Sequence, residues 1–286
     1  MIMLPLLLFF TCFVHTQEIL HDFVFIICSY NNLQWADKNL TTLFAQEYPA
    51  EHFRAIYVDD CSNDGTYAYV TKFKEEHRLG DRLTIIRNPK RKLKAHNLYF
   101  AGHMCKKHEI IIELDGDDWL PTTTVLNYLN TVYQDNSIWL TYGNNIKWPT
   151  RRLEMRVKEV PEYVVEKGTF RQYTDCNFWT AMRSYYAWLF QKIEKRDFVY
   201  SVKQKHSRWF EMSIDASIYF SMLEMARERH KFCDYPLYVH NIETQFNDHK
   251  VNVGLQYTIE TYLRGLKPYP RLSDSEAYHV TYYASR

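Results

Sequence analysis

Short apolar runs alternate with longer amphipathic stretches between residues 23 and 142. The apolar runs have the length and composition of strands, and the stretches between them have the spacing of helices. We predict strands at residues 23–28, 55–58, 83–86, 110–114 and 137–142, and helices at residues 33–45, 66–77, 93–104 and 122–133. Strands that alternate with helices of this length form a parallel sheet with right-handed crossovers. The pattern therefore predicts an α/β fold with a mostly parallel central sheet flanked by helices.

The periodicity weakens in the second half of the chain. Residues 144–178 mix charges, prolines and aromatics without a clear period. Beyond them we predict helices at residues 180–193, 214–229 and 251–263, and a strand at residues 236–240. No flexible linker divides the chain, so we expect residues 17–143 and residues 144–286 to pack as one unit.

The first residues form a segment of their own. Residues 2–14 are almost wholly apolar, which is shorter than the roughly 20 residues that a membrane-spanning helix needs. We interpret residues 1–16 as a signal peptide cut before Gln17, with a short membrane anchor and a buried segment as alternatives. A signal peptide places the protein in the lumen of the secretory pathway or outside the cell, where the triplet at residues 39–41 (N-L-T) could accept a glycan.

Charge and cysteine content exclude two classes of protein. The formal net charge is +1, which argues against a nucleic-acid binder that relies on a broad basic face. None of the six cysteines forms a C-x-x-C pair, so a zinc ribbon or a redox motif is not indicated.

Acidic clusters follow two of the predicted strands. Asp59 and Asp60 come after one strand, and Asp115, Asp117 and Asp118 come after another. Ligands of such sheets bind beyond the carboxyl ends of the strands, where these clusters converge. Carboxylates so close together repel unless a cation compensates them, and Mg²⁺ or Mn²⁺ bridges carboxylate to phosphate. The alternative is that each cluster is a solvated turn that caps the next helix.

Glycine-rich phosphate cradles are absent from the sequence. Neither G-x-G-x-x-G nor G-x-x-x-x-G-K-[ST] occurs, and residues 28–32 (C-S-Y-N-N) do not form a glycine-rich loop. This argues against a dinucleotide-dependent oxidoreductase and a sugar-phosphate nucleotidyltransferase. A bound diphosphate would instead be neutralised by a metal ion and side chains.

Three motifs in order resemble the family 2 glycosyltransferases of the GT-A fold. They are F-I-I-C-S-Y-N at 25–31, Y-V-D-D-C-S-N-D-G-T at 57–66 and E-L-D-G-D-D-W-L-P at 113–121. A fainter similarity in the second half comprises S-I-D-A at 213–216 and P-L-Y at 236–238. The sequence departs from the family at Cys28, where proline or threonine is commoner, and at Ile214, where the family more often has Glu.

The resemblance implies a donor half at residues 17–143 and an acceptor-binding, catalytic half at residues 144–286. Its implied nucleotide-sugar residues are Cys28, Tyr30, Asp59, Asp60 and Asp115; its implied metal ligands are Asp115, Asp117 and Asp118; and its implied general base is Asp215. It implies metal-dependent transfer of a sugar, with UDP-sugar as the default donor, to a hydroxyl of a glycan, protein or lipid, with inversion. A catalytically inactive relative that binds a nucleotide or glycan is the alternative function.

Several weaker candidates have structural alternatives. Asp215 could be a first-turn carboxylate of a helix that Ser213 caps, and Glu211 is then the reserve base. His240 or His249 could add a metal ligand. Basic residues at 90–92 and Lys94 could contact phosphate. Aromatic residues Trp179, Tyr185, Tyr186 and Trp188 could stack on an acceptor sugar, although their helical spacing favours the core.

Overall fold

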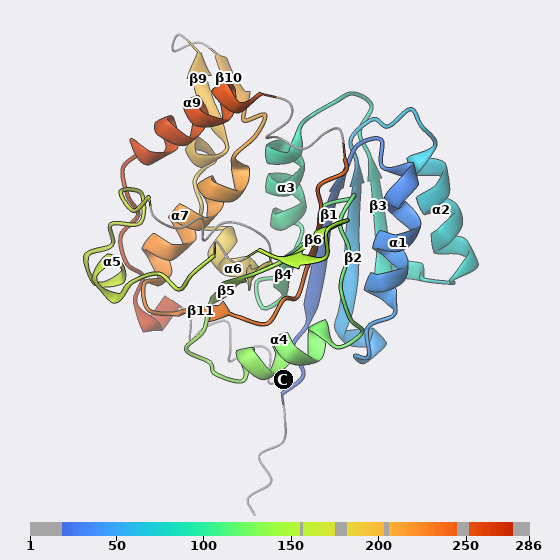
Figure 1. Cartoon of the computed structure of the whole chain (residues 1–286), viewed down its shortest axis with the longest axis horizontal. Helices are drawn as coiled ribbons and strands as arrows, with labels where there is room; N and C mark the ends of the chain where they lie inside the picture. Colours follow the sequence, from blue (N-terminus) through green and yellow to red (C-terminus); the bar gives the residue numbers. More distant parts are fainter. Residues whose placement is uncertain (1–18, 155–156, 175–181, 203–205, 245–251, 277–286) are drawn as a thin grey trace, which may run out of the picture.

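A seven-stranded sheet runs through the centre of the computed structural model, which describes residues 19–154, 157–174, 182–202, 206–244 and 252–276 (Figure 1). The strand order is β11-β5-β8-β4-β1-β2-β3. These strands are β1 (Phe23–Ser29), β2 (Phe53–Asp59), β3 (Leu83–Arg87), β4 (Ile110–Glu113), β5 (Leu140–Gly143), β8 (Arg183–Tyr186) and β11 (His230–Cys233). Every pairing is parallel except those of β8, which is antiparallel to both β4 and β5. The predicted α/β fold with a mostly parallel sheet is confirmed.

Helices pack around this sheet. They are α1 (Leu33–Phe44), α2 (Thr66–Glu76), α3 (Lys94–His103), α4 (Val125–Tyr133), α5 (Glu162–Lys167), α6 (Ala187–Phe190), α7 (Ile214–Ala226) and α9 (Val253–Arg264), with 3₁₀ turns η1 (Ala50–His52), η2 (Gly80–Arg82) and η3 (Lys195–Asp197). In Figure 1, α1 and α2 lie beside β2 and β3, whereas α7 and α9 lie at the other side of the molecule. Within the described ranges, no helix has both the length and the apolar character needed to cross a membrane.

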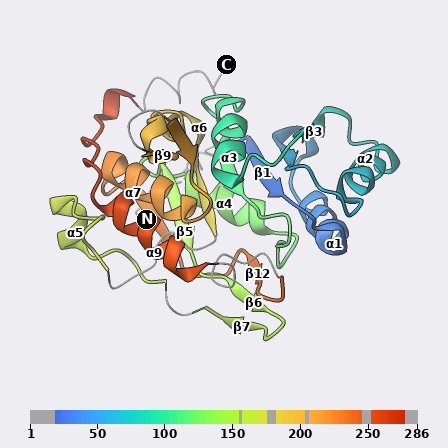
Figure 2. The same cartoon turned by 90° about the horizontal axis from the view of Figure 1, so that it is seen from above.

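Two smaller sheets complete the fold. One has the order β12-β6-β7 and joins β6 (Ile146–Trp148), β7 (Arg152–Leu153) and β12 (Val239–Asn241). The other is the antiparallel hairpin of β9 (Val199–Val202) and β10 (His206–Trp209). Figure 2 shows β6, β7 and β12 together at one edge of the molecule. Within the irregular stretch at residues 144–178, the described residues therefore form the short strands β6 and β7 and the short helix α5.

The predicted helix at residues 180–193 is wrong for its described part. Residues 183–186 form β8, and only residues 187–190 form the helix α6. All four residues of β8 are buried, because the strand lies between β4 and β5 in the middle of the sheet. A strand that is buried on both faces has no alternation of polar and apolar residues, so its sequence resembles a buried helix.

Other boundaries differ by a few residues. The strand predicted at residues 236–240 is β12 at Val239–Asn241 and belongs to the small sheet. Residues 1–16, Trp179 and His249 lie outside the described residues. The division into a donor and an acceptor half stays a prediction, although β8 and β11 show that the central sheet takes strands from both halves.

Candidate functional site

The turns after β1, β2 and β4 meet at the carboxyl end of the sheet. The amide of Asp60 donates to the carbonyl of Ser29 over 2.8 Å, and the amide of Gly116 donates to the carbonyl of Cys28 over 3.3 Å. These backbone bonds bring the two acidic clusters predicted from the sequence to one edge, where ligands of parallel α/β sheets bind.

Gly116 is required by a close approach between two of these turns. A Cβ atom on Gly116 would lie 2.5 Å from Ser29 Oγ and 2.8 Å from Asn32 Nδ2. A side chain there would push the Asp115–Asp118 turn away from the end of β1. The glycine between Asp115 and Asp117 therefore allows the acidic turn to pack against the neighbouring strand.

Asp60 is held by donors from the segment that leads into α3. Its Oδ1 accepts from Asn88 Nδ2 and from the amide of Lys92, both at 2.8 Å, and its Oδ2 accepts from the amide of Leu93 at 2.9 Å. Arg91 Nε lies 3.4 Å from Oδ2. Burial would raise the pKa of Asp60, but these hydrogen bonds lower it below its ordinary value. Asp60 is therefore a charged residue that fixes the course of residues 91–93.

The other predicted nucleoside residues lie around Asp60. The guanidinium of Arg91 lies 3.6 Å from the centre of the Tyr30 ring. Burial raises the pKa of the Cys28 thiol, which is consequently neutral. Asp59 is fully buried and accepts from the amide of Ser62 over 3.2 Å, so it stabilises the turn after β2.

Leu93 has a backbone conformation that is rare for a residue with a side chain. Its φ of 75° and ψ of 157° lie in a region that is nearly restricted to glycine and costs about 1–3 kcal/mol. The bonds from the amides of Lys92 and Leu93 to Asp60 hold the chain in this conformation. The next residue, Lys94, begins α3 and reaches the acidic turn after β4.

Two cations join Asp115 of the D-x-D motif to Asp215. Lys94 Nζ lies 2.7 Å from Asp115 Oδ1 and 3.3 Å from Asp215 Oδ1. Arg183 Nη1 lies 2.9 Å from Asp215 Oδ2, and its Nη2 lies 3.8 Å from Asp115 Oδ2. The structure thus brings together a predicted metal-binding residue and the predicted base, which are 100 positions apart in the sequence.

Both cations are charged because of their carboxylate partners. Burial would lower the pKa of Lys94 and of Arg183, but Asp115 and Asp215 raise both pKa values well above their ordinary range. Arg183 Nε also lies 3.4 Å from Glu113 Oε2, and the hydroxyl of Tyr185 donates to Glu113 Oε1 over 2.9 Å. The strand β8 therefore supplies a buried arginine that links the end of β4 to the start of α7.

Asp118 has a full set of partners within the protein. Its Oδ2 accepts from the hydroxyl of Tyr238 at 2.6 Å, and its Oδ1 accepts from the amide of Asn241 at 2.7 Å. His240 Nδ1 lies 3.3 Å from Oδ2. Burial would lower the pKa of His240, but Asp118 and the neighbouring aspartates raise it to about 9. Asp118 thus connects the D-x-D turn to β12, and its assignment as a metal ligand stays a prediction.

Asp117 differs from its neighbours in having no such partner. No described side chain donates a hydrogen bond to its carboxylate or forms an ion pair with it. Burial, together with the charges of Asp118 and Asp115, raises the pKa of Asp117 to about 7. A divalent cation would compensate this excess of negative charge.

The residues of the D-x-D turn therefore fit a hard divalent ion. Within the described ranges, no group of three or more His, Cys, Asp or Glu side chains is arranged to hold a metal. Mg²⁺ does not need such a group, because it is commonly held by one or two carboxylates, phosphate oxygens and water. Asp117 is the carboxylate that is available for this role.

Asp215 lies in the first turn of α7, as the sequence suggested. Ser213 precedes the helix, but its hydroxyl donates to the carbonyl of Gln256 over 3.4 Å and does not cap the helix. The reserve base, Glu211, pairs with Arg208 and accepts from the hydroxyl of Tyr200 over 3.1 Å. Asp215, unlike Glu211, shares its cations with Asp115.

Four further sequence candidates have structural roles. Tyr185, Tyr186 and Trp188 are buried in the core, as their spacing favoured. Asn39, the residue of the predicted glycosylation triplet, is also fully buried. Its Nδ2 donates to the carbonyls of Asp115 and Asp118 over 3.0 and 2.8 Å. A glycan on Asn39 is incompatible with this packing, so the expectation of a glycosylation site there is wrong for the folded chain.

Sequence reasoning missed the role of Arg183 and treated Lys94 only as a phosphate contact. Arg183 is a charged residue next to the aromatic run of residues 185–190, and a cation in such a setting needs buried partners. That signal was available in the sequence. The identity of the partners depends on the pairing of β8 with β4, which the sequence pattern did not indicate.

A protein-family model matches more than half of the chain. The model described as "Glycosyl transferase family 2" matches residues 24–198. This range covers the acidic turns after β2 and β4 and ends before α7. Comparison with curated proteins gives no match.

Solved structures of similar fold include two transferases. TarS 1–349 of S. aureus in complex with UDP-GlcNAc has a TM-score of 0.62 at 15% identity, over 91% of this chain and 70% of that chain. Mannosyltransferase PcManGT from Pyrobaculum calidifontis, in complex with GDP-Man and Mn²⁺, has a TM-score of 0.60 at 16% identity, over 93% of this chain and 72% of that chain. Against a longer TarS structure, the chain spans 43% of that protein's length. These likenesses confirm the predicted GT-A type of fold.

Proposed function

This chain belongs to glycosyl transferase family 2, and we propose that it transfers a sugar from a nucleotide-sugar to an acceptor hydroxyl, with inversion and with a divalent metal ion. One observation carries the proposal. Lys94 and Arg183 each contact both Asp115 of the D-x-D motif and Asp215. A donor-binding carboxylate and a base are thereby held in one site.

The donor is a nucleoside diphosphate sugar, with UDP-sugar as the first choice and a hexose as the sugar. Support comes from the two similar structures, which hold UDP-GlcNAc and GDP-Man. In this chain, Cys28, Tyr30 and Asp60 would line the nucleoside pocket. Asp59 would stabilise the turn next to that pocket, because its fully buried carboxylate accepts a hydrogen bond from the amide of Ser62.

The diphosphate lies at the turn after β4. Asp117 would hold the Mn²⁺ or Mg²⁺ ion, and Asp115 would contribute once Lys94 turns toward the phosphates. When bound, the ion neutralises the negative charge that develops on the departing nucleoside diphosphate. Lys94 is charged and lies beside Asp115, so it supplies a second positive charge at the same point.

Asp215 accepts the proton of the acceptor hydroxyl as the hydroxyl oxygen attacks the anomeric carbon. Arg183 is a positioning residue, because it is buried, bonds Asp215 and is itself fixed by Glu113. A single base on the face opposite the leaving group gives inversion at the anomeric carbon. The acceptor is a hydroxyl of a glycan, a protein or a lipid.

The place of action follows from the N-terminal segment. We propose that residues 1–16 direct the chain to the secretory pathway lumen or out of the cell, or anchor it to a membrane. Expression of the full chain followed by N-terminal sequencing of the mature protein tests this, since a signal peptide gives a new terminus at Gln17.

Release of nucleoside diphosphate tests the transferase activity. Full-length protein is incubated with UDP-sugars and GDP-sugars, with Mn²⁺ and a mixture of acceptor glycans, and the released nucleotide is measured. The proposal predicts release from one nucleotide class that is lost in Asp215→Asn. Binding of a nucleotide-sugar without any release, across all donors and acceptors, would favour the catalytically inactive relative instead.

A further inference from the structure

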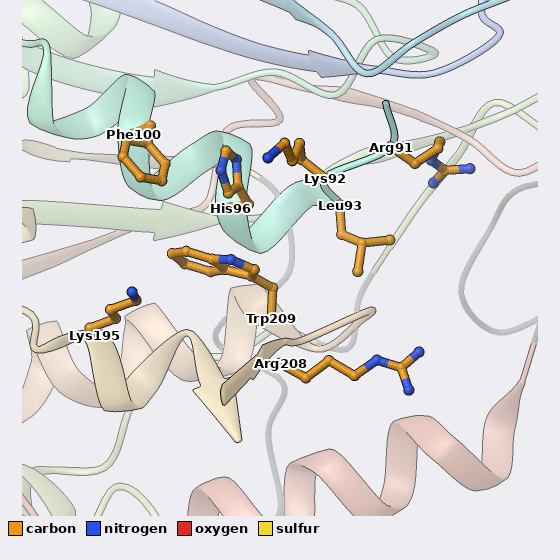
Figure 3. A pocket seen from close by; sticks show the side chains of 8 residues that line it. All are labelled: Arg91, Lys92, Leu93, His96, Phe100, Lys195, Arg208 and Trp209. Carbon is orange, nitrogen blue, oxygen red and sulfur yellow. The ribbon is translucent and has the colours of Figure 1, made fainter. Parts of the chain in front are cut away.

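A pocket of about 470 Å³ lies between α3 on one side and β10 with η3 on the other (Figure 3). Arg91, Lys92 and His96 line it from the segment that leads into α3 and from the first turns of that helix. Trp209 and Arg208 of β10 and Lys195 of η3 form the opposite side. Asp115, Asp117 and Lys94, which the proposed function places at the donor diphosphate and the metal, do not line this pocket. Arg91 and Lys92, which do line it, belong to the basic residues at 90–92 that the sequence offered as phosphate contacts.

Positive charge is concentrated in the pocket. Four of its eight lining residues are lysine or arginine, and none is aspartate or glutamate. The whole chain carries a formal charge of only +1, so this concentration does not reflect a generally basic protein. Such a cluster repels itself and attracts anions.

Two of the four cations have no carboxylate partner among the residues that the structure describes. Arg91 is shared with Asp60, and Arg208 pairs with Glu211. Lys92 and Lys195 form no ion pair within the described ranges. Both lysines line the pocket together with His96.

An aromatic surface lies beside these charges. The Trp209 ring packs edge-on against His96, with ring centres 5.0 Å apart, and Lys195 Nζ lies 5.2 Å from the centre of the Trp209 ring. Figure 3 shows Trp209 below His96, with Phe100 on the adjoining turn of α3. Sites that bind small molecules typically combine an aromatic wall with a few placed polar groups.

On both sides of the pocket, the lining residues are close along the chain to Asp215, the proposed base, or to Lys94, which contacts it. Lys94, which lies 3.3 Å from Asp215, is in the chain between the lining residues Leu93 and His96. On the other side, Trp209 precedes Asp215 by six positions, and Asp215 is the second residue of α7. Asp215 does not itself line the pocket. A general base must lie within hydrogen-bond reach of the hydroxyl that it deprotonates, so an acceptor held in the pocket would extend past Lys94 to reach Asp215.

We propose that this pocket binds an anionic glycan acceptor, whose carboxylate, sulfate or phosphate group pairs with Lys92 and Lys195 and whose sugar ring packs on Trp209. The inference rests on the proposed glycosyl transfer and adds the substrate class. The three acidic groups share one chemistry, a compact anion on a sugar, and the experiment separates them.

Binding of acceptor oligosaccharides can be measured without any transfer. Full-length protein is titrated calorimetrically with a carboxylated hyaluronan tetrasaccharide, a sulfated heparin tetrasaccharide, a phosphorylated tetrasaccharide and neutral chitotetraose. We expect at least one anionic ligand to bind, chitotetraose to bind more weakly, and the affinity to fall as salt is added. The anion that binds most tightly identifies the acidic group.

A charge-matched pair of variants assigns the binding to this pocket. In Lys92→Gln/Lys195→Gln we expect the anionic ligand to bind about tenfold or more weakly, since charged hydrogen bonds are lost. In the control Lys72→Gln/Lys167→Gln, which removes the same charge from α2 and α5, the affinity stays at the wild-type value. Circular dichroism and the melting temperature show that both variants fold.

Several outcomes would overturn the inference. They are equal affinity for neutral and anionic ligands, no binding of any anionic ligand by folded wild-type protein, and equal weakening in both double variants. A fourth is loss of nucleotide-sugar binding in Lys92→Gln/Lys195→Gln, which would assign the pocket to the donor diphosphate. Failure of the transferase proposal is separate, because it appears as absent nucleotide-sugar binding in the wild type.

Discussion

The two acidic turns at the carboxyl end of the sheet differ in how their charges are compensated. Asp60, after β2, accepts three hydrogen bonds, two of them from backbone amides, and Asp59 is fully buried beneath the same turn. After β4, Asp118 is the one aspartate whose carboxylate accepts from a distant backbone amide among the residues that the structure describes. Asp115 relies on Lys94, and Asp117 has no described side-chain partner.

This difference shows why a count of acidic residues does not identify a ligand site. Both turns contain adjacent aspartates after a buried strand, yet the first turn uses its carboxylates to hold its own backbone. In the second turn, Asp115 forms an ion pair with Lys94, and the carboxylate of Asp117 has no described side-chain partner. A bound cation is expected where negative charge is left uncompensated.

The largest effect is expected at Asp215, the proposed general base, which Lys94 and Arg183 join to the second turn. In Asp215→Asn, the rate of sugar transfer should fall about 10²–10⁴-fold, because the amide cannot accept the proton. Donor binding should remain, and single-turnover kinetics with bound nucleotide-sugar measures both quantities. An Asp215→Asn protein with wild-type turnover would remove the residue from the mechanism, and Glu211→Gln would then be the variant to test.

The next largest effect is expected at Arg183. In Arg183→Met, the buried carboxylate of Glu113 loses its cation, and the free energy of unfolding should fall by about 3–5 kcal/mol. Chemical denaturation measures this loss. In the double variant Glu113→Gln/Arg183→Met much of the stability should return, whereas transfer should stay slow, because Asp215 still lacks its positioning partner. Recovery of both properties together would show that Arg183 acts only through stability.

The smallest effect is the contrast between the two neighbours in the second turn. Asp118→Asn should lower the free energy of unfolding by about 1–3 kcal/mol. An asparagine has one acceptor oxygen, so either the amide of Asn241 or the hydroxyl of Tyr238 loses its acceptor. Asp117→Asn should not lower the free energy of unfolding, because no described side-chain partner is lost and the burial and neighbouring charges that raise the pKa of Asp117 disfavour its carboxylate in the fold. Denaturation of the two proteins side by side measures the difference. Equal destabilisation would mean that the two carboxylates have the same structural role.

The first half of the fold could be predicted because its pattern is regular. The predicted strand at residues 23–28 became β1 at Phe23–Ser29, and the predicted helix at residues 33–45 became α1 at Leu33–Phe44. Alternating strands and helices also imply which strand ends converge, so the meeting of the two acidic turns followed from the sequence. The short elements β6, β7, β9 and β10 have no such periodicity and were missed.

The partners within the site could not be predicted, because they come from distant parts of the chain. Asp118 was assigned to a metal, but Tyr238 and Asn241, which bond it, follow 120 or more positions later. The link between Asp115 and Asp215 depends on Arg183, which reaches them only because β8 lies between β4 and β5. Trp209 of the basic pocket depends in the same way on the packing of β10 against α3.

Metal-dependent binding of the donor tests the central claim most directly. Thermal shifts of the full-length protein are measured with UDP, GDP, CMP and their sugar conjugates, with Mn²⁺ or with EDTA, for the wild type and for Asp117→Asn. We predict that one nucleotide class raises the melting temperature of the wild type in Mn²⁺, and that EDTA or Asp117→Asn abolishes the shift. An equal shift in EDTA and in Asp117→Asn would contradict a metal-held diphosphate at the turn after β4, and no shift with any nucleotide would contradict the donor site itself.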